Sequence, residues 1–128
     1  MRVDGELSTV AGPKRIVGGW HHLVGVLDQD ASMRLYVDGK RVAEGKSTKG
    51  LLPKVPANGF SIGQNTGSIV GNYEGPNPLT GIIDELRLYF AAASDEQVTK
   101  RFEDGSEMHP EPHRVLSFDD ASFRDLSL

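Results

Sequence analysis

Hydrophobic residues alternate with a period of two along most of the chain, which is typical of β-strands. Between Trp20 and Asp28 both alternating sets are largely apolar, so we expect a strand that is covered on both faces. The segment 33–44 predicts a β-hairpin, because Asp38-Gly39 suits a two-residue turn whose central positions need positive φ. Residues equidistant from this turn would pair: Val37 with Lys40, Tyr36 with Arg41, Leu35 with Val42, and Met33 with Glu44. The inward-facing set would be Met33, Leu35, Val37 and Val42.

The middle of the chain is rich in glycine and proline and predicts loops around short strands. Residues 46–59 predict a loop, 60–63 a short strand, and 64–78 a long polar loop. Residues 79–91 return to strand alternation. Its predicted inward set is Ile82, Asp84, Leu86, Leu88 and Phe90, and its outward set is Glu85, Arg87 and Tyr89.

One segment predicts a helix. Ser94 is suited to the N-cap, Gln97 to the reciprocal position of a capping box, and Gly105 follows the last turn. Residues Val98, Phe102 and Arg101 would lie against the sheets. A connector with two prolines follows, and then a tail strand is predicted from Val115 to Phe118.

Composition narrows the class of protein. A chain of 128 residues suits one domain, and 38% hydrophobic with 25% charged residues suits a soluble globular one. The net charge of −4 argues against nucleic acid as a partner. The absence of cysteine excludes disulfides, thiolate zinc sites and cysteine nucleophiles. The sequence has no apolar run of roughly 18 residues that would span a membrane, and its first ten residues lack the apolar core of a signal peptide.

Three stretches taken together carry a family resemblance. "WHHLVGVLDQDASMRLYVDGKRVAEG", "FSIG" and "LTGIIDELRLYFAAASDEQV" resemble, in this order, the second half of a laminin-G-like, concanavalin A-like jelly-roll domain. The resemblance covers about residues 2–104 and implies an all-β antiparallel sandwich with one short C-terminal helix. Only nineteen residues precede the Trp-His strand, so the N-terminal strands of such a sandwich are expected to be lacking. The tail stretch "RVLSFDD" resembles an opening strand of such domains.

The run Trp20-His21-His22 raises the question of a metal site or a sugar-stacking platform. Adjacent histidines on a strand point to opposite faces, which makes it difficult for both to bind one metal ion, and a third ligand is not evident nearby. The resemblance implies that Trp20 and His22 are buried packing residues of the framework. We interpret the run as structural.

Asp84 is a candidate metal ligand. Strand alternation would place its carboxylate among apolar side chains, where a charge needs a cation or several hydrogen bonds. The resemblance implies a structural calcium near this position, and calcium prefers oxygen ligands. The alternative is an aspartate that accepts backbone N–H bonds at a strand start. Both interpretations stay open.

Other acidic residues have simpler interpretations. Glu85 and Arg87 are two apart on one face and predict an ion pair. Asp28 and Asp30 flank a turn and are interpreted as turn residues, because aspartate forms local hydrogen bonds there.

The loop 64–78 is the candidate binding surface. It offers amide and hydroxyl groups with one aromatic ring, which suit the hydroxyls and C–H face of a sugar. The residues are Gln64, Asn65, Asn72, Tyr73 and Asn77. The alternative is a connector without a binding role.

Catalysis is not expected. Some glycoside hydrolases of this fold alternate their carboxylates along one strand, but Asp84 and Glu85 are adjacent and would point to opposite faces. Two carboxylates that act on one glycosidic bond must share a face at about 5 to 10 Å. Nucleophile-elbow and phosphate-loop motifs are also absent from the sequence.

The sequence therefore predicts a sandwich portion over residues 1–105 and a connector with a tail strand over 106–128. The tail would complete this sandwich, pair with a second chain as a strand-swapped homodimer, or begin another domain. We expect a non-catalytic module of a larger extracellular or cell-surface protein, one that binds a glycan or polysaccharide and has a catalytic domain as a candidate neighbour in the same polypeptide. The alternative is a structural or protein-interaction domain without a small ligand. Neither nucleic acid nor a membrane is an expected partner.

Overall fold

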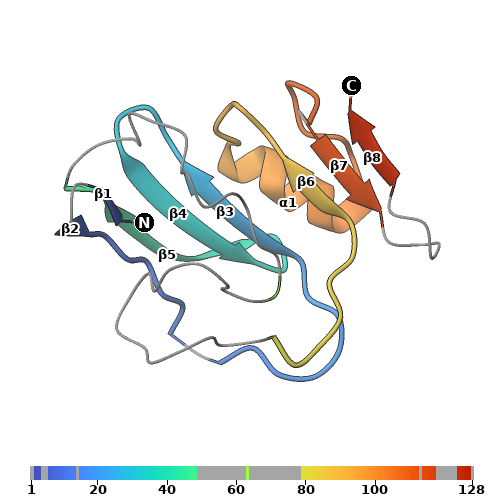
Figure 1. The fold of residues 1–128 in the computed structure, drawn as a ribbon, viewed down its shortest axis with the longest axis horizontal. Coiled ribbons are helices and arrows are strands. Elements are labelled where there is room, and N and C mark those ends of the chain that lie inside the picture. The colour runs from blue at the N-terminus through green and yellow to red at the C-terminus, as the bar shows by residue number, and fades with distance from the viewer. Residues whose placement is uncertain are drawn as a thin grey trace.

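The computed structural model describes residues 2–3, 6–13, 15–48, 63, 79–112, 114–117 and 124–127 (Figure 1). In chain order the elements are β1 (Arg2–Val3), β2 (Glu6–Leu7), β3 (Leu23–Leu27), β4 (Ser32–Val37), β5 (Lys40–Lys46), β6 (Leu86–Leu88), α1 (Asp95–Asp104), β7 (Arg114–Ser117) and β8 (Arg124–Ser127). The described strands form three sheets, β1–β2, β3–β4–β5 and β6–β7–β8, and every pairing is antiparallel. The predicted all-β antiparallel class with one short helix is confirmed. Within the described ranges, no helix is long and apolar enough to cross a membrane.

The hairpin β4–β5 turns where it was predicted to turn. Asp38 and Gly39 have φ of 51° and 74°, and Val37 pairs with Lys40. Beyond Tyr36 the predicted register is wrong, because a β-bulge between Leu35 and Tyr36 shifts the pairing by one residue. Leu35 therefore lies opposite Ala43 and Met33 opposite Gly45, rather than opposite Val42 and Glu44.

The most deeply buried face of this sheet is the one predicted to point outward. Tyr36 is 1% exposed, whereas the predicted inward set of Met33, Leu35, Val37 and Val42 is only half-buried. The reason is tertiary, because α1 packs against the Tyr36 face. The buried core consists of Val26, Tyr36, Val98 and Met108.

Helix α1 begins and ends with the capping residues that the sequence predicts. The capping box between Ser94 and Gln97 and the left-handed cap at Gly105 are both present. Val98 is completely buried. Asp95 attaches the helix to the hairpin, since its Oδ1 accepts a 2.7 Å hydrogen bond from the Tyr36 hydroxyl.

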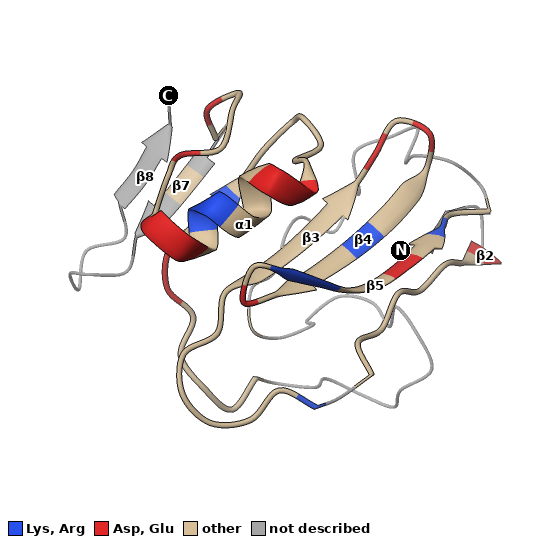
Figure 2. Ribbon diagram, turned by 180° about the vertical axis from the view of Figure 1, so that it is seen from behind, with Lys and Arg blue, Asp and Glu red and all other residues tan. Residues whose placement is uncertain are grey.

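Two basic side chains strengthen the same attachment. Arg34 of β4 and Arg41 of β5 both make ion pairs with Asp95. Figure 2 shows the acidic residues at the start of α1 and the basic segments of the neighbouring strands. Carboxylates in the first helical turn also interact favourably with the helix dipole. Asp28, which pairs with Arg34, and Asp30, which accepts the Ser32 N–H, are turn residues as predicted.

Two predicted strands are shorter in the structure. β3 starts at Leu23 rather than Trp20, and β6 covers only Leu86–Leu88 of the predicted 79–91. Glu85, just before β6, has a φ of 54°, so the strand alternation does not extend back through it. Of the predicted strand 60–63 only Gly63 lies within the described residues, in a bend.

The tail forms strand β7 within the same chain. Leu116 of β7 pairs antiparallel with Leu86 of β6, and β8 extends the sheet on the other side of β7. The strand covers Arg114–Ser117 instead of the predicted 115–118, and Phe118 lies outside the described residues. The division into 1–105 and 106–128 stays a prediction.

Candidate functional site

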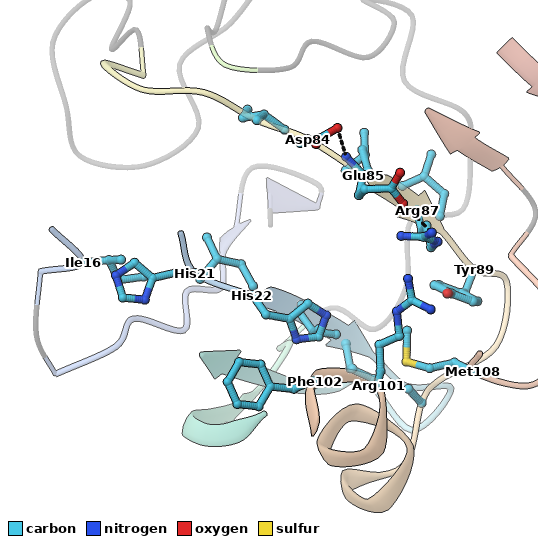
Figure 3. A pocket seen from close by; sticks show the side chains of 18 of the residues that line it. Ile16, His21, His22, Asp84, Glu85, Arg87, Tyr89, Arg101, Phe102 and Met108 are labelled. Carbon is cyan, nitrogen blue, oxygen red and sulfur yellow. Dashed lines mark hydrogen bonds and ion pairs between the residues drawn. The ribbon is translucent and has the colours of Figure 1, made fainter. Parts of the chain in front are cut away.

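A wide, open cleft lies between β3 and the segment that contains β6, and one end of α1 contributes to its wall (Figure 3). Its volume is about 1940 Å³. Among the described strands, β3 pairs only with β4 and β6 only with β7, so both present an unpaired edge. Large apolar side chains that line it are strongly exposed, among them Leu23 at 57%, Ile82 at 77% and Phe90 at 84%. Exposed apolar surface of this kind is common at interaction surfaces and ligand-binding grooves.

Trp20 lies on the wall of this cleft and is 70% exposed. The prediction that it is a buried framework residue is therefore wrong. β3 begins only at Leu23, so Trp20 does not share the strand's alternation. It follows Gly18 and Gly19, which have positive φ values of 73° and 69° in a bend, and its indole ring is exposed.

His21, like His22, precedes β3, so the strand alternation on which its prediction depended does not apply to it. Its Nδ1 lies 2.8 Å from Asp38 Oδ2, and its Nε2 lies 2.8 Å from the Gly18 carbonyl oxygen. Only the protonated ring can donate to both acceptors. The hydrogen bond to Asp38 is the largest cause that raises the pKa of His21, and the same bond lowers the pKa of Asp38.

His22 is half-buried and packs against α1. Its ring stacks on Phe102 with centroids 6.1 Å apart and an interplanar angle of 26°. Burial is the largest cause that lowers the pKa of His22, and the nearby Arg101 and Arg87 lower it further. The ring is therefore neutral near pH 7. Its Nδ1 is buried and has no hydrogen-bond partner among the described residues.

Two arginines and a tyrosine converge on the same part of the cleft (Figure 3). Arg87 of β6 makes the predicted ion pair with Glu85. The Nη1 of Arg101 donates to the Gly105 carbonyl at 2.7 Å and to Glu107 Oε1 at 2.8 Å.

Tyr89 lies beside these guanidinium groups. Its hydroxyl is buried without a partner in the described part of the chain. Burial is the largest cause that raises the pKa of Tyr89, so the hydroxyl keeps its proton.

Asp84 does not point inward as predicted. Its side chain is exposed, and its Oδ1 accepts a 2.8 Å hydrogen bond from the Glu85 N–H. Ile82 and Phe90 of the same predicted inward set are also exposed, whereas Leu86 and Leu88 are half-buried. The left-handed Glu85 explains the difference, because it interrupts the alternation on which the prediction depended. Within the described residues, no group of three or more His, Cys, Asp or Glu side chains could hold a metal ion.

The five predicted sugar-binding residues of the loop 64–78 cannot be placed in the cleft. Gln64, Asn65, Asn72, Tyr73 and Asn77 all lie outside the described residues. Sequence reasoning also did not bring together His22, Arg87, Tyr89 and Arg101. The sequence does contain a pattern that points to part of this group. Arg87 and Tyr89 are two positions apart and would share one face of a strand, and Arg101 lies one helical turn from the core residue Val98.

Comparison with known protein families identifies the family of this chain. Residues 2–99 match the model of the concanavalin A-like lectin/glucanases superfamily. The chain belongs to this superfamily. The predicted family is thereby confirmed.

A solved structure has a similar fold. The chain is similar to an S-layer domain-containing protein from Clostridium thermocellum, solved as residues 221–444, with 24% sequence identity and a TM-score of 0.52. The match covers 73% of the present chain but only 43% of that structure. At this identity the similarity concerns the fold alone. No curated protein matches the sequence.

Proposed function

We propose that this superfamily domain is a non-catalytic carbohydrate-binding module of a larger cell-surface or secreted protein. The observation that carries the proposal is Trp20, a strongly exposed indole on the wall of an open cleft. An aromatic face stacks on the C–H face of a sugar ring, and polar groups beside it bind the hydroxyls. The structural neighbour is an S-layer domain-containing protein, which supports a place at the cell surface.

Affinity electrophoresis through gels that contain plant, algal or host polysaccharides tests this function. Trp20→Ala should abolish retardation by the polysaccharide that binds, and Trp20→Phe should retain part of it, because a smaller aromatic face remains. Leu23→Ala is the matched control: Leu23 is an exposed apolar residue of the same cleft that has no ring to stack. Unretarded migration in every gel would refute carbohydrate binding.

The loop 64–78 stays a second candidate surface. If it binds the sugar, Tyr73→Ala should remove retardation while Trp20→Ala leaves it intact. The two variants therefore separate the loop from the cleft.

A structural or protein-interaction module is the second candidate function, and the exposed apolar residues of the cleft favour it. Leu23, Ile82 and Phe90 lie next to two strand edges with which no described strand pairs, and they form a surface that another β-strand could cover. If the β6–β7 pairing formed between two chains, the product would be a strand-swapped dimer. Sedimentation of a dimer, together with migration unaffected by any glycan, would favour this function.

Structural calcium at Asp84 also remains a proposal. If Asp84 binds calcium, EDTA should lower the melting temperature, added calcium should restore it, and Asp84→Asn should abolish the response. A melting curve unchanged by EDTA would contradict the proposal.

A further inference from the structure

The two arginines of the cleft, Arg87 and Arg101, have more guanidinium N–H donors than their protein contacts use. The side chains of Arg87 and Arg101 are only 19% and 15% exposed, and both guanidinium groups point into the same space (Figure 3). A guanidinium group is always charged, so two of them in a partly buried site need anionic partners.

Among the described residues, the counter-ions of these arginines are two half-exposed glutamates. Glu85 and Glu107 are 42% and 53% exposed. Glu85 contacts Nη2 of Arg87, and Glu107 contacts Nη1 of Arg101. The remaining guanidinium N–H groups of both arginines have no partner among the described residues. A guanidinium with a free edge can bind a planar or tetrahedral oxyanion through two parallel hydrogen bonds.

Two further polar atoms at this place lack partners. The Tyr89 hydroxyl and the His22 Nδ1 are both buried and without a hydrogen bond in the described part of the chain. Buried polar groups in proteins are normally hydrogen-bonded, and a buried group without a bond calls for a ligand or a bound water. The hydroxyl can donate a hydrogen bond to an anion held between the arginines.

We propose that the cleft contains an anionic subsite in which Arg87, Arg101 and the Tyr89 hydroxyl bind the carboxylate or sulfate group of an acidic polysaccharide. The proposal rests on carbohydrate binding at the cleft and specifies its ligand class. Trp20 lines the same cleft, so one sugar residue of a chain would stack there while a charged residue reaches the arginines. The half-exposed Glu85 and Glu107 can turn to water when the anion binds.

Matched pairs of polymers test the charge requirement. Isothermal titration calorimetry compares polygalacturonate with its methyl-esterified form, and dextran sulfate with dextran. The charged member of at least one pair should bind at least tenfold more tightly, and which pair responds identifies carboxylate or sulfate. Arg87→Gln and Arg101→Gln should each weaken that binding by roughly tenfold, as expected for the loss of a charge-assisted hydrogen bond.

Two variants make the test independent of general charge and of folding. Lys100→Gln removes the same charge from the same helix at an exposed side chain outside the cleft, and it should change affinity less than twofold. Tyr89→Phe should weaken charged-polymer binding without lowering the melting temperature, because its hydroxyl has no partner among the described residues.

The outcomes separate the subsite from the proposed function. Equal binding of the charged and neutral polymers, lost in Trp20→Ala, would refute the subsite and leave carbohydrate binding standing. An equal loss in Lys100→Gln and Arg101→Gln would also refute the subsite, because it would indicate a non-specific charge effect. If none of the polymers nor any other polysaccharide bound, both proposals would fail.

Discussion

Removing one oxygen atom tests how α1 is attached to the sheet. Tyr36 is 1% exposed and its hydroxyl donates to Asp95 Oδ1 at 2.7 Å. A hydrogen bond to a charged group contributes about 1.5–3 kcal/mol. The Asp95 side chain is 51% exposed and keeps its arginine partners, so water replaces part of the lost bond. We therefore expect Tyr36→Phe to lower the free energy of unfolding by about 1 kcal/mol, or the melting temperature by about 4 °C.

Urea unfolding followed by circular dichroism measures this difference, and Tyr89→Phe is the matched control. The same atom is removed there, but from a hydroxyl without a partner in the described residues. The stability of the Tyr89→Phe variant should therefore equal or exceed that of the unaltered protein. The hydrogen bond from Tyr36 is also the largest cause that lowers the pKa of Asp95. A lowered carboxyl pKa contributes stability above the usual value of about 4, and this contribution is lost as pH falls through the folded value. The Tyr36→Phe deficit should therefore shrink in acid, and equal deficits for the two tyrosine variants would refute the attachment.

Three further predictions concern the edge of the cleft and the hairpin. Because its pKa is raised, His21 should stabilise the fold fully below about pH 6.5 and lose that effect as pH rises through its folded pKa. NMR titration should give the raised pKa of His21, and thermal melts of His21→Gln should show the lost stability at low pH. An NMR midpoint at or below the usual histidine value would contradict this prediction. Gly39→Ala should cost more than about 1 kcal/mol, since a Cβ there would lie 3.0 Å from Phe102 at a φ of +74°, whereas Gly18→Ala meets nothing within 4 Å and should cost less. Trp20 should be quenched strongly by iodide, and Trp20→Ala should cost less than about 1 kcal/mol rather than the 3–5 of a buried tryptophan; weak quenching would restore the framework interpretation.

Local chemistry in the sequence determined several elements of this protein. The Asp38-Gly39 turn and the helix from its Ser94 cap to Gly105 depend on residues within a few positions of each other, so their signals are complete in a short window. The antiparallel all-β class and the family likewise follow from alternation and from motifs read in order along the chain.

Tertiary structure decided which faces are buried and which residues meet. Tyr36 is buried because α1 packs on its side of the hairpin, and Trp20 is exposed because β3 starts three residues later. Alternation defines two faces of a strand but does not determine which one a distant helix will cover. Arg87 of β6 and Arg101 of α1 come together only through the packing of these two elements. Their proximity therefore cannot be predicted from the linear sequence.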